Sequence, residues 1–281
     1  MTILELIQKT TSYFEKAGVP NSRLDIELLL SHVLGLKRME LYLQFERVLT
    51  ENELDQLRPL VKRRGLREPL QHIIGSVDFC DVKLQVSPAA LIPRPETELL
   101  VQAVLDRFSA DSSFKFLDMG TGTGAVALAI CKVRPHASAI AIDISTEALE
   151  LAKTHPEKNQ ILNQIEFRQG NLFEPVKPGE EFDLIVSNPP YIPTNVISTL
   201  QSEVQHDPKL ALDGGEDGLK IISALIRDSQ KYLKPRGRLI FEMGHDQRSS
   251  VEKLLQNENF GEIGFVNDLQ GYARVALTRK L

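Results

Sequence analysis

An Asn-Pro-Pro-Tyr segment is the part of this sequence whose residue types best suit a chemical step. It consists of Asn188, Pro189, Pro190 and Tyr191, directly after the apolar run at 182–187. Proline fixes φ and has no N–H, so the nearby acceptor oxygens have little freedom and few competing donors. The Asn188 side-chain carbonyl and the Pro189 main-chain carbonyl can each accept one N–H of a planar NH2 group, while Tyr191 packs beside it. For an isolated Asn-Pro, the alternative is a turn that ends a strand.

A glycine-rich loop stands between an expected strand at 114–119 and an expected helix that begins at Ala125. The loop residues are Gly120, Thr121, Gly122, Thr123 and Gly124. This order of elements brings backbone N–H groups and a helix N-terminus close to a cofactor. The glycine spacing differs from the dinucleotide fingerprint, and the Gly-Lys-Ser/Thr ending of a P-loop is missing. The loop therefore predicts a cofactor other than NAD and no ATP hydrolysis.

Two further strand ends carry polar residues. The strand expected at 138–142 ends in Asp143, about twenty residues beyond the glycines, where a carboxylate can accept both hydroxyls of a ribose. The alternative for Asp143 is helix capping together with Ser145 and Glu147. The strand expected at 165–169 leads to Asn171 and Leu172. There the Asn171 oxygen can face an adenine amino group and Leu172 can cover the ring, the alternative being an Asn-containing turn.

These loops are expected to meet at one edge of a sheet. Ligands of open α/β sheets bind outside the carboxyl ends of the strands, so all four loops would converge on a single crevice. Three of the loops suit the methionine part, the ribose and the adenine of S-adenosyl-L-methionine, and the fourth carries Asn188.

The glycine loop and the Asn-Pro-Pro-Tyr segment together resemble class I S-adenosylmethionine-dependent methyltransferases that act on a planar nitrogen. Further motifs make the chain similar to the HemK/PrmC family, the peptide chain release factor glutamine methyltransferases. They lie at 68–75, 91–98, 211–219 and 268–271 with Arg274-Val275, so the resemblance spans essentially the whole chain. The sequence departs from the family where Asn171 replaces a more frequent Asp, and at Tyr272-Ala273. The first departure weakens the adenine assignment.

The resemblance implies an α/β fold of the class I methyltransferase type, Rossmann-like, with a seven-stranded sheet that is mostly parallel and whose last strand is antiparallel. Apolar spacing predicts helices at 3–15, 22–34 and 52–66, and alternation predicts a hairpin at 77–86. We therefore expect an N-terminal helical domain at 1–75 that docks the substrate, a hairpin and helix linker at 76–110, and the methyltransferase domain at 111–281.

Alternating elements are also expected along the second half of the chain. One predicted helix begins at Pro95 and ends at Phe108, and three more span 145–154, 218–233 and 247–257. The later strands are predicted at 238–243, 262–266 and 274–278.

Composition limits the classes of function. The chain has 281 residues, 42% of them hydrophobic, a net charge of −5 and a pI of about 5.8. This balance disfavours a protein whose affinity comes from neutralising many phosphates, and no direct nucleic-acid partner is expected. One basic cluster, Lys62-Arg63-Arg64 with Arg67, is interpreted as a solvated helix end, the alternative being contact with an acidic or RNA-bearing partner.

Cysteine and histidine usage indicates a reduced compartment without a metal centre. Cys80 and Cys131 are too few for a disulfide framework or a zinc site, and the six histidines show no metal-ligand spacing. His72 and His245 are expected to pack or form hydrogen bonds. The first residues predict a helix without a signal peptide, and no apolar run is long enough for a bilayer, so we expect a cytoplasmic protein.

The family resemblance implies in-line transfer of a methyl group to the side-chain nitrogen of a glutamine on a release factor, with Asn188 and Pro189 orienting that nitrogen. No general base is identified, and Glu96, Glu98 and Glu242 remain unassigned.

Three other functions stay open from the residues alone. Methylation of a ribosomal protein's glutamine would use the same chemistry. A DNA adenine methyltransferase would also use it, but needs a base-recognition region, for which only 192–217 is available, a short segment poor in cations. A nucleotide-binding adaptor without activity would gain nothing from Asn188 and Pro189.

Overall fold

The computed structural model describes residues 1–161 and 163–281 and divides them into two compact units. The first, the helical unit, consists of Met1–Ser76 and Gln201–His206. The second, the sheet unit, consists of Val77–Leu200 and Asp207–Leu281. The segment expected as a linker, 76–110, thus lies almost wholly in the sheet unit, and the chain passes into the helical unit a second time at Gln201–His206.

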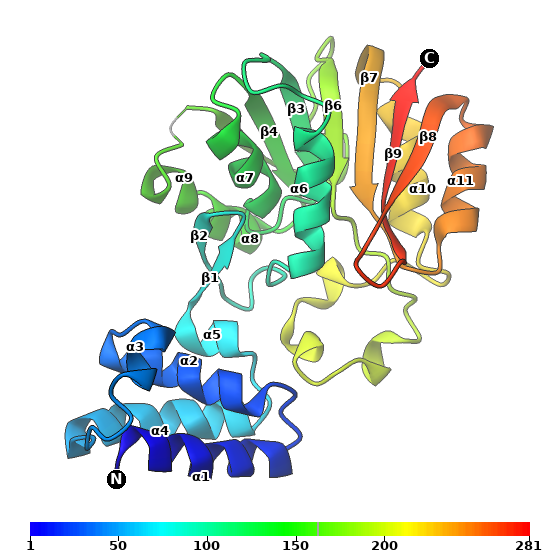
Figure 1. Ribbon diagram of the computed structural model, residues 1–281. Helices are drawn as coiled ribbons and strands as arrows, with labels where there is room; N and C mark the ends of the chain where they lie inside the picture. Colours follow the sequence, from blue (N-terminus) through cyan, green and yellow to red (C-terminus); the bar gives the residue numbers. More distant parts are fainter. Residues whose placement is uncertain (162) are drawn as a thin grey trace. The chain divides into compact units, whose positions relative to one another are not determined.

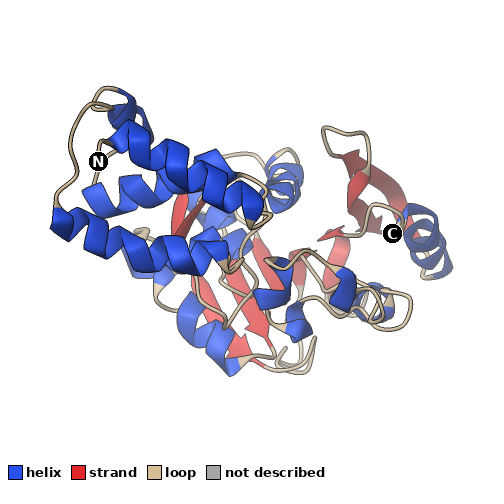
Figure 2. Ribbon diagram, turned by 90° about the horizontal axis from the view of Figure 1, so that it is seen from below, coloured by secondary structure: helices blue, strands red, loops and turns tan. Residues whose placement is uncertain are grey.

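Helices at the expected places build the helical unit: α1 (Ile3–Lys16), α2 (Ser22–Leu34) and α4 (Glu51–Gly65), with the short helices α3 (Arg38–Tyr42) and α5 (Leu70–Ile74). Thr2 and Thr50 begin α1 and α4 with capping boxes, each completed by a glutamate three residues later. The long helices lie side by side near the N-terminus (Figure 2) and enclose an aliphatic core that includes Ile7, Phe14 and Leu29.

The basic cluster at the end of α4 was expected to be a solvated helix end, and this is wrong for Arg64 and Arg67, although Lys62 is exposed. The Arg64 side chain is only 4% exposed, and it donates hydrogen bonds to Asp25 Oδ2 at 2.7 Å and to Glu203 Oε1 at 2.8 Å. Arg67 also pairs with Glu203, through its Nε at 2.7 Å from Oε1. Long-range carboxylates, invisible in the local pattern, therefore neutralise these cations and fasten Gln201–His206 to the helical unit.

The sheet unit contains a seven-stranded sheet in the order β5-β4-β3-β6-β7-β9-β8, which confirms the expected fold class. Its strands are β3 (Lys115–Met119), β4 (Ser138–Asp143), β5 (Ile165–Gln169), β6 (Phe182–Ser187), β7 (Leu233–Glu242), β8 (Phe260–Asn267) and β9 (Ala273–Lys280). The pairs from β5 to β7 are parallel, and β9 is antiparallel to both its neighbours. A separate two-stranded sheet holds β1 (Ser76–Phe79) and β2 (Val82–Gln85).

Helices cover both faces of this sheet (Figure 1). Residues of α6 (Glu98–Leu105) and α7 (Ala125–Val133) share one apolar cluster with alternate strand residues such as Phe116 and Leu184. Residues of α10 (Lys220–Ser229) and α11 (Arg248–Asn257) share another with the intervening strand residues. Because both faces are buried, the central parallel strands β3, β4 and β6 are mostly apolar, whereas the edge strand β5 carries Glu166 and Arg168.

Short elements complete the sheet unit near the strand ends. They are α8 (Thr146–Ala152), α9 (His155–Lys158) and the 3-10 turns η1 (Pro95–Thr97), η2 (Ile197–Thr199) and η4 (Lys209–Ala211), while η3 (Val204–His206) belongs to the helical unit. No helix in the described ranges, 1–161 and 163–281, is long and apolar enough to cross a bilayer.

Candidate active site

The carboxyl ends of the central parallel strands are tied together by hydrogen bonds. The Ser187 hydroxyl at the end of β6 donates to the Met119 carbonyl at the end of β3 over 2.7 Å. The Gly122 N–H donates to Asp143 Oδ2 over 2.8 Å, and the Gly170 N–H donates to the Asp143 carbonyl over 3.0 Å. Four loops that are far apart in sequence thus form one continuous rim.

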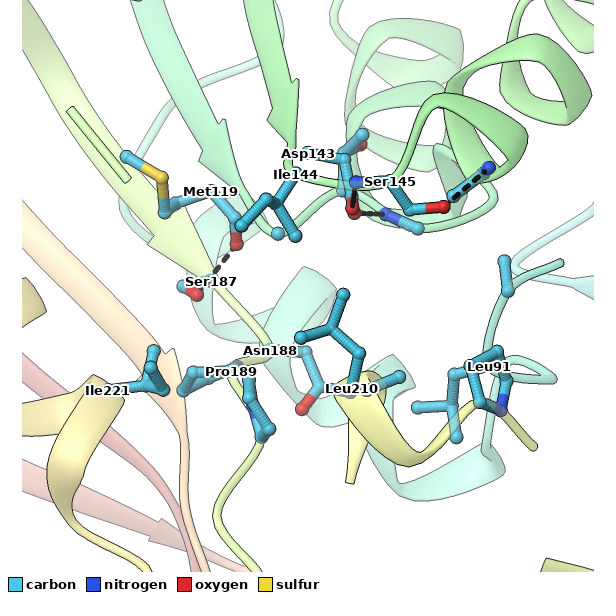
Figure 3. Close-up of a pocket in the computed structure, with 18 of the residues that line it drawn as sticks. Leu91, Met119, Asp143, Ile144, Ser145, Ser187, Asn188, Pro189, Leu210 and Ile221 are labelled. Atoms are coloured by element: carbon cyan, nitrogen blue, oxygen red, sulfur yellow. Dashed lines mark hydrogen bonds between the residues drawn. The ribbon is translucent and has the colours of Figure 1, made fainter. Parts of the chain in front are cut away.

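A cavity of about 590 Å³ lies against this rim. Figure 3 shows Met119 and Asp143 on its upper side, and Asn188, Pro189, Leu210 and Leu91 on its lower side. The cavity is lined by most of the residues expected from the sequence: Gly120, Thr121, Gly122, Thr123, Asp143, Asn171, Leu172, Asn188, Pro189 and Pro190. Gly124 and Tyr191 lie next to lining residues but do not form the wall themselves.

The glycine loop presents bare backbone to the cavity. Gly120 and Gly122 have φ values of 70° and 55°, and a Cβ added at either would meet no atom within 4 Å. Only glycine adopts this conformation readily, so the loop can turn sharply and still leave room for a ligand. Gly124 instead allows close packing, because a Cβ added there would lie 3.4 Å from the Leu128 side chain of α7.

Asp143 is not the cap of the following helix. The Ser145 hydroxyl accepts from the Ala148 N–H over 3.1 Å and caps α8, whereas the Asp143 carboxylate accepts from the Gly122 and Ser145 N–H groups. Burial raises the pKa of Asp143, and these backbone donors lower it. Each carboxylate oxygen has a second lone pair, so the group can still accept hydroxyls from the cavity.

A second carboxylate beside the loop was not singled out from the sequence. Asp118 is almost fully buried at the end of β3, where its Oδ2 accepts from the Thr121 hydroxyl over 2.6 Å and from the Ala127 N–H over 3.2 Å. Burial raises the pKa of Asp118 to about 6. Asp118 therefore links strand, loop and helix, and it also lines the cavity.

The Asn171 loop is shaped by a backbone of unusual conformation. Leu172 has a φ of 47°, which is uncommon for a residue other than glycine, and both residues line the cavity. The Asn171 side chain is exposed, so its amide oxygen is available to a ligand in the cavity.

A buried hydrogen-bonded chain lies behind Asn188. The Asn188 Nδ2 donates to Thr97 Oγ1 over 3.0 Å, and the Thr97 hydroxyl donates to Glu242 Oε2 over 2.7 Å. The Tyr191 hydroxyl donates to the other oxygen, Glu242 Oε1, over 2.9 Å. Gln247 Nε2 donates to the Tyr191 main-chain carbonyl over 3.0 Å.

Of the two ionisable residues in this hydrogen-bonded group, Glu242 is almost fully buried and Tyr191 is partly buried. Burial raises the pKa of Glu242. Hydrogen bonds from the Thr97 and Tyr191 hydroxyls and the positive charge of Arg274 act in the opposite direction and lower it. Burial and the adjacent Glu242 carboxylate raise the pKa of Tyr191. Of the glutamates left unassigned from the sequence, Glu242 thus enters the site through Thr97 and Tyr191. Glu98, by contrast, accepts a hydrogen bond from the Cys80 N–H.

A buried histidine supports the glycine loop through a hydrogen bond to its backbone. His155 Nε2 accepts the Gln85 N–H over 3.0 Å, so Nδ1 carries the proton and donates to the Thr123 carbonyl over 2.9 Å. Burial lowers the pKa of His155 and keeps the ring neutral. No sequence motif marks this residue, because its two partners lie on separate elements.

Other cavity residues also escaped the sequence analysis. They are mostly apolar. Leu91, Pro93, Leu210, Ala211 and Ile221 come from the 91–98 and 211–219 motif regions and their neighbours, and Ile144 follows Asp143. Among the residues that the structure describes, no group of three or more His, Cys, Asp or Glu side chains could hold a metal ion.

Solved structures with the same fold include a methyltransferase from Pyrococcus furiosus, with a TM-score of 0.54 and 16% identity over 71% of this chain and 89% of that one. They also include the T. thermophilus 16S rRNA methyltransferase RsmC, solved in complex with AdoMet and guanosine, with a TM-score of 0.55 and 18% identity over 73% of this chain and 50% of that one. At these identities the likeness concerns the fold.

Sequence relatives define the family. The PrmC N-terminal domain matches residues 5–75, and a methyltransferase domain family matches residues 110–269. The release factor glutamine methyltransferase of Geobacter sulfurreducens is 40% identical over 98% of this chain and 95% of its own length. The enzyme of the same name from Rhodopirellula baltica is 38% identical over 99% and 96%. With matches of this extent, the chain belongs to the release factor glutamine methyltransferase family.

Proposed function

We propose that this protein methylates the side-chain amide nitrogen of the glutamine in the Gly-Gly-Gln motif of class 1 peptide chain release factors, with S-adenosylmethionine as methyl donor. Relatives named release factor glutamine methyltransferase that match nearly the full chain support the activity. The cavity that joins the glycine loop to Asn188 supports the assignment of the reacting groups to this site.

The residues around the cavity fit S-adenosylmethionine. Gly120 and Gly122 leave open space above their backbone, Asp143 can accept ribose hydroxyls, and Asn171 and Leu172 can meet the adenine. The bound cofactor supplies an electrophilic methyl group on a positively charged sulfur. The apolar walls, including Leu91 and Leu210, would keep water away from that group.

The observation that carries the proposal is the hydrogen bonding of Asn188. Its Nδ2 is engaged with Thr97. Within residues 1–161 and 163–281, its Oδ1 and the Pro189 carbonyl accept no hydrogen bond from the protein. These two acceptors can take both N–H bonds of a glutamine amide, turn its nitrogen toward the methyl group and stabilise the positive charge that develops there.

Positioning must supply most of the catalysis, because the lone pair of an amide nitrogen is delocalised into its carbonyl. Both oxygens of Glu242 are occupied by Thr97 and Tyr191, so we assign that carboxylate no proton transfer. The final proton leaves to water.

Selection of the protein substrate requires a surface remote from the reacting nitrogen, because a glutamine side chain cannot distinguish one protein from another. We assign this docking to the helices of residues 1–75, which form part of the helical unit and contribute nothing to the cavity. The partner is thus a protein, with no direct nucleic-acid contact, and the enzyme works in the cytoplasm alongside translation.

Labelled methyl transfer from S-adenosylmethionine to purified release factor, ribosomal proteins and DNA, run side by side, tests this function. We expect label on the release factor alone. Faster labelling of a ribosomal protein would show that the substrate is that protein and not a release factor. Labelling of DNA would show that the substrate is a nucleic acid and not a protein.

A further inference from the structure

Three polar side chains from separate parts of the sheet unit, those of Asn188, Thr97 and Glu242, form a hydrogen-bonded relay. Thr97 belongs to η1 and is 3% exposed, and Glu242 belongs to the end of β7 and is 2% exposed. Thr97 Oγ1 lies 3.0 Å from Asn188 Nδ2 and 2.7 Å from Glu242 Oε2. Of the relay residues, Asn188 and Thr97 line the cavity and Glu242 does not.

The chemistry of these groups gives the relay a fixed direction. Both Glu242 carboxylate oxygens accept from hydroxyl groups, Oε1 from Tyr191 and Oε2 from Thr97, and a threonine hydroxyl has only one proton to donate. That proton goes to Glu242, so the Thr97 oxygen can only accept from Asn188. The Asn188 amide must then present its NH2 to Thr97, which turns Oδ1 away from the relay. Tyr191 donates to the second carboxylate oxygen and keeps Glu242 in place.

We propose that Thr97 and Glu242 are positioning residues that fix which end of the Asn188 amide faces the substrate. The proposal rests on the proposed function, in which Asn188 accepts an N–H of the target glutamine. If the amide were rotated by half a turn, its NH2 would face the NH2 of the substrate, donor against donor, and the nitrogen would lose its orientation. Glu242 therefore acts through Thr97, without touching the substrate.

The first test compares variants that differ only in the relay. Thr97→Val keeps the shape of the side chain but removes the hydroxyl, and we expect kcat to fall about tenfold or more, the scale of one lost hydrogen bond. Thr97→Ser restores the hydroxyl and should restore most of kcat. In Glu242→Gln the new amide can donate to Thr97, which frees the threonine proton for Asn188 Oδ1, so kcat should fall at least as far. S-adenosylmethionine affinity should be unchanged in all three variants.

The second test asks whether Thr97 acts through Asn188. Adding Thr97→Val to Asn188→Ala should cause no further loss of kcat, whereas a merely structural role for Thr97 would make the two losses multiply. The side-chain N–H resonances of Asn188 in the free enzyme should also shift in Thr97→Val and not in Thr97→Ser, a readout that needs no methyl transfer.

Wild-type kcat in folded Thr97→Val, or multiplying losses in the double variant, would overturn the proposal. If Glu242→Gln does not fold, the comparison of Thr97→Val with Thr97→Ser is sufficient to test the proposal. These outcomes are separate from failure of the proposed function, which would appear as a wild-type enzyme that does not methylate a release factor.

Discussion

Thr97 and Asn188 are 91 residues apart in sequence, yet the hydroxyl of one lies 3.0 Å from the amide nitrogen of the other. This contact joins the segment that opens α6 to the segment that ends β6. It leaves the Asn188 oxygen for the cavity, and the account of catalysis given above depends on that arrangement.

Replacing Asp143 tests the assignment of the ribose site. Asp143→Ala should weaken S-adenosylmethionine binding by about tenfold or more, because it removes a carboxylate acceptor and frees the Gly122 loop. Calorimetry measures the affinity. Ser145→Ala is the matched control: it removes the cap of α8, at a cost of about 0.5–2 kcal/mol of stability, and leaves the carboxylate in place. Equal affinities of the wild type and a folded Asp143→Ala protein would remove Asp143 from the site.

Two asparagines in the same cavity should have separable effects. Asn188→Ala should lower kcat by about 10² or more with nearly unchanged cofactor affinity, since it loses an interaction made with the reacting nitrogen. Asn171→Ala should instead raise the KM for S-adenosylmethionine and leave kcat close to wild type. Steady-state kinetics with both substrates varied distinguishes them, and near-normal turnover of Asn188→Ala at saturating substrate would refute its role.

The sequence predicted much of the fold because the elements are locally encoded. The apolar runs of β3, β4 and β6 and the glycines between β3 and α7 indicate their structures without tertiary information, and their ends also form the cavity rim. The family resemblance implied seven strands with the last one antiparallel, but the order of the strands, which the apolar pattern does not encode, comes from the structure.

The supporting residues could not be predicted in the same way. Glu242 and His155 form hydrogen bonds with residues on distant elements. Glu203 lies in Gln201–His206, a segment that belongs to the helical unit only because of its three-dimensional contacts. The basic cluster containing Arg64 reads as a solvated helix end until Asp25 and Glu203 are placed beside it.

Gly218 sets the position of the Tyr191 backbone. A Cβ added at Gly218 would clash with the Tyr191 carbonyl oxygen and lie 2.7 Å from Gln247 Nε2, the group that holds that carbonyl. Gly218→Ala should therefore lower both kcat and the thermal unfolding midpoint. Gly271→Ala provides the control, because φ is 88° at Gly271 and 74° at Gly218 but a Cβ at Gly271 meets nothing within 4 Å. An equal loss of kcat in the two variants would show that backbone strain alone, and not the contact with Tyr191, causes the effect.

Glu203 should stabilise the helical unit in a pH-dependent manner. Burial acts to raise the pKa of Glu203, but hydrogen bonds from Arg67 and Arg64 outweigh it and hold the pKa at about 2, below the ordinary 4.5. Because the folded pKa is the lower one, the stabilisation is complete above about pH 4.5 and is lost as the pH falls toward 2.

Hydrogen exchange of α2 and α4 amides measures this contribution. Glu203→Ala leaves the buried Arg64 with one carboxylate fewer and should lower the opening free energy by about 3 kcal/mol at neutral pH, the range for a broken buried pair. Glu262→Ala, which removes an exposed partner of Arg279, should leave these amides unchanged. Exchange in Glu203→Ala equal to wild type at neutral pH would show that the segment is held by other contacts.

Mapping the methylated atom on a release factor tests the central claim most directly. The full-length enzyme is incubated with S-adenosylmethionine and intact release factor, and the product is sequenced by tandem mass spectrometry. The account predicts a single added methyl group on the side-chain nitrogen of the Gly-Gly-Gln glutamine, none when that glutamine is replaced by glutamate, and almost none with Asn188→Ala. A methyl group on any other atom, or undiminished methylation of the glutamate-containing release factor, would contradict it.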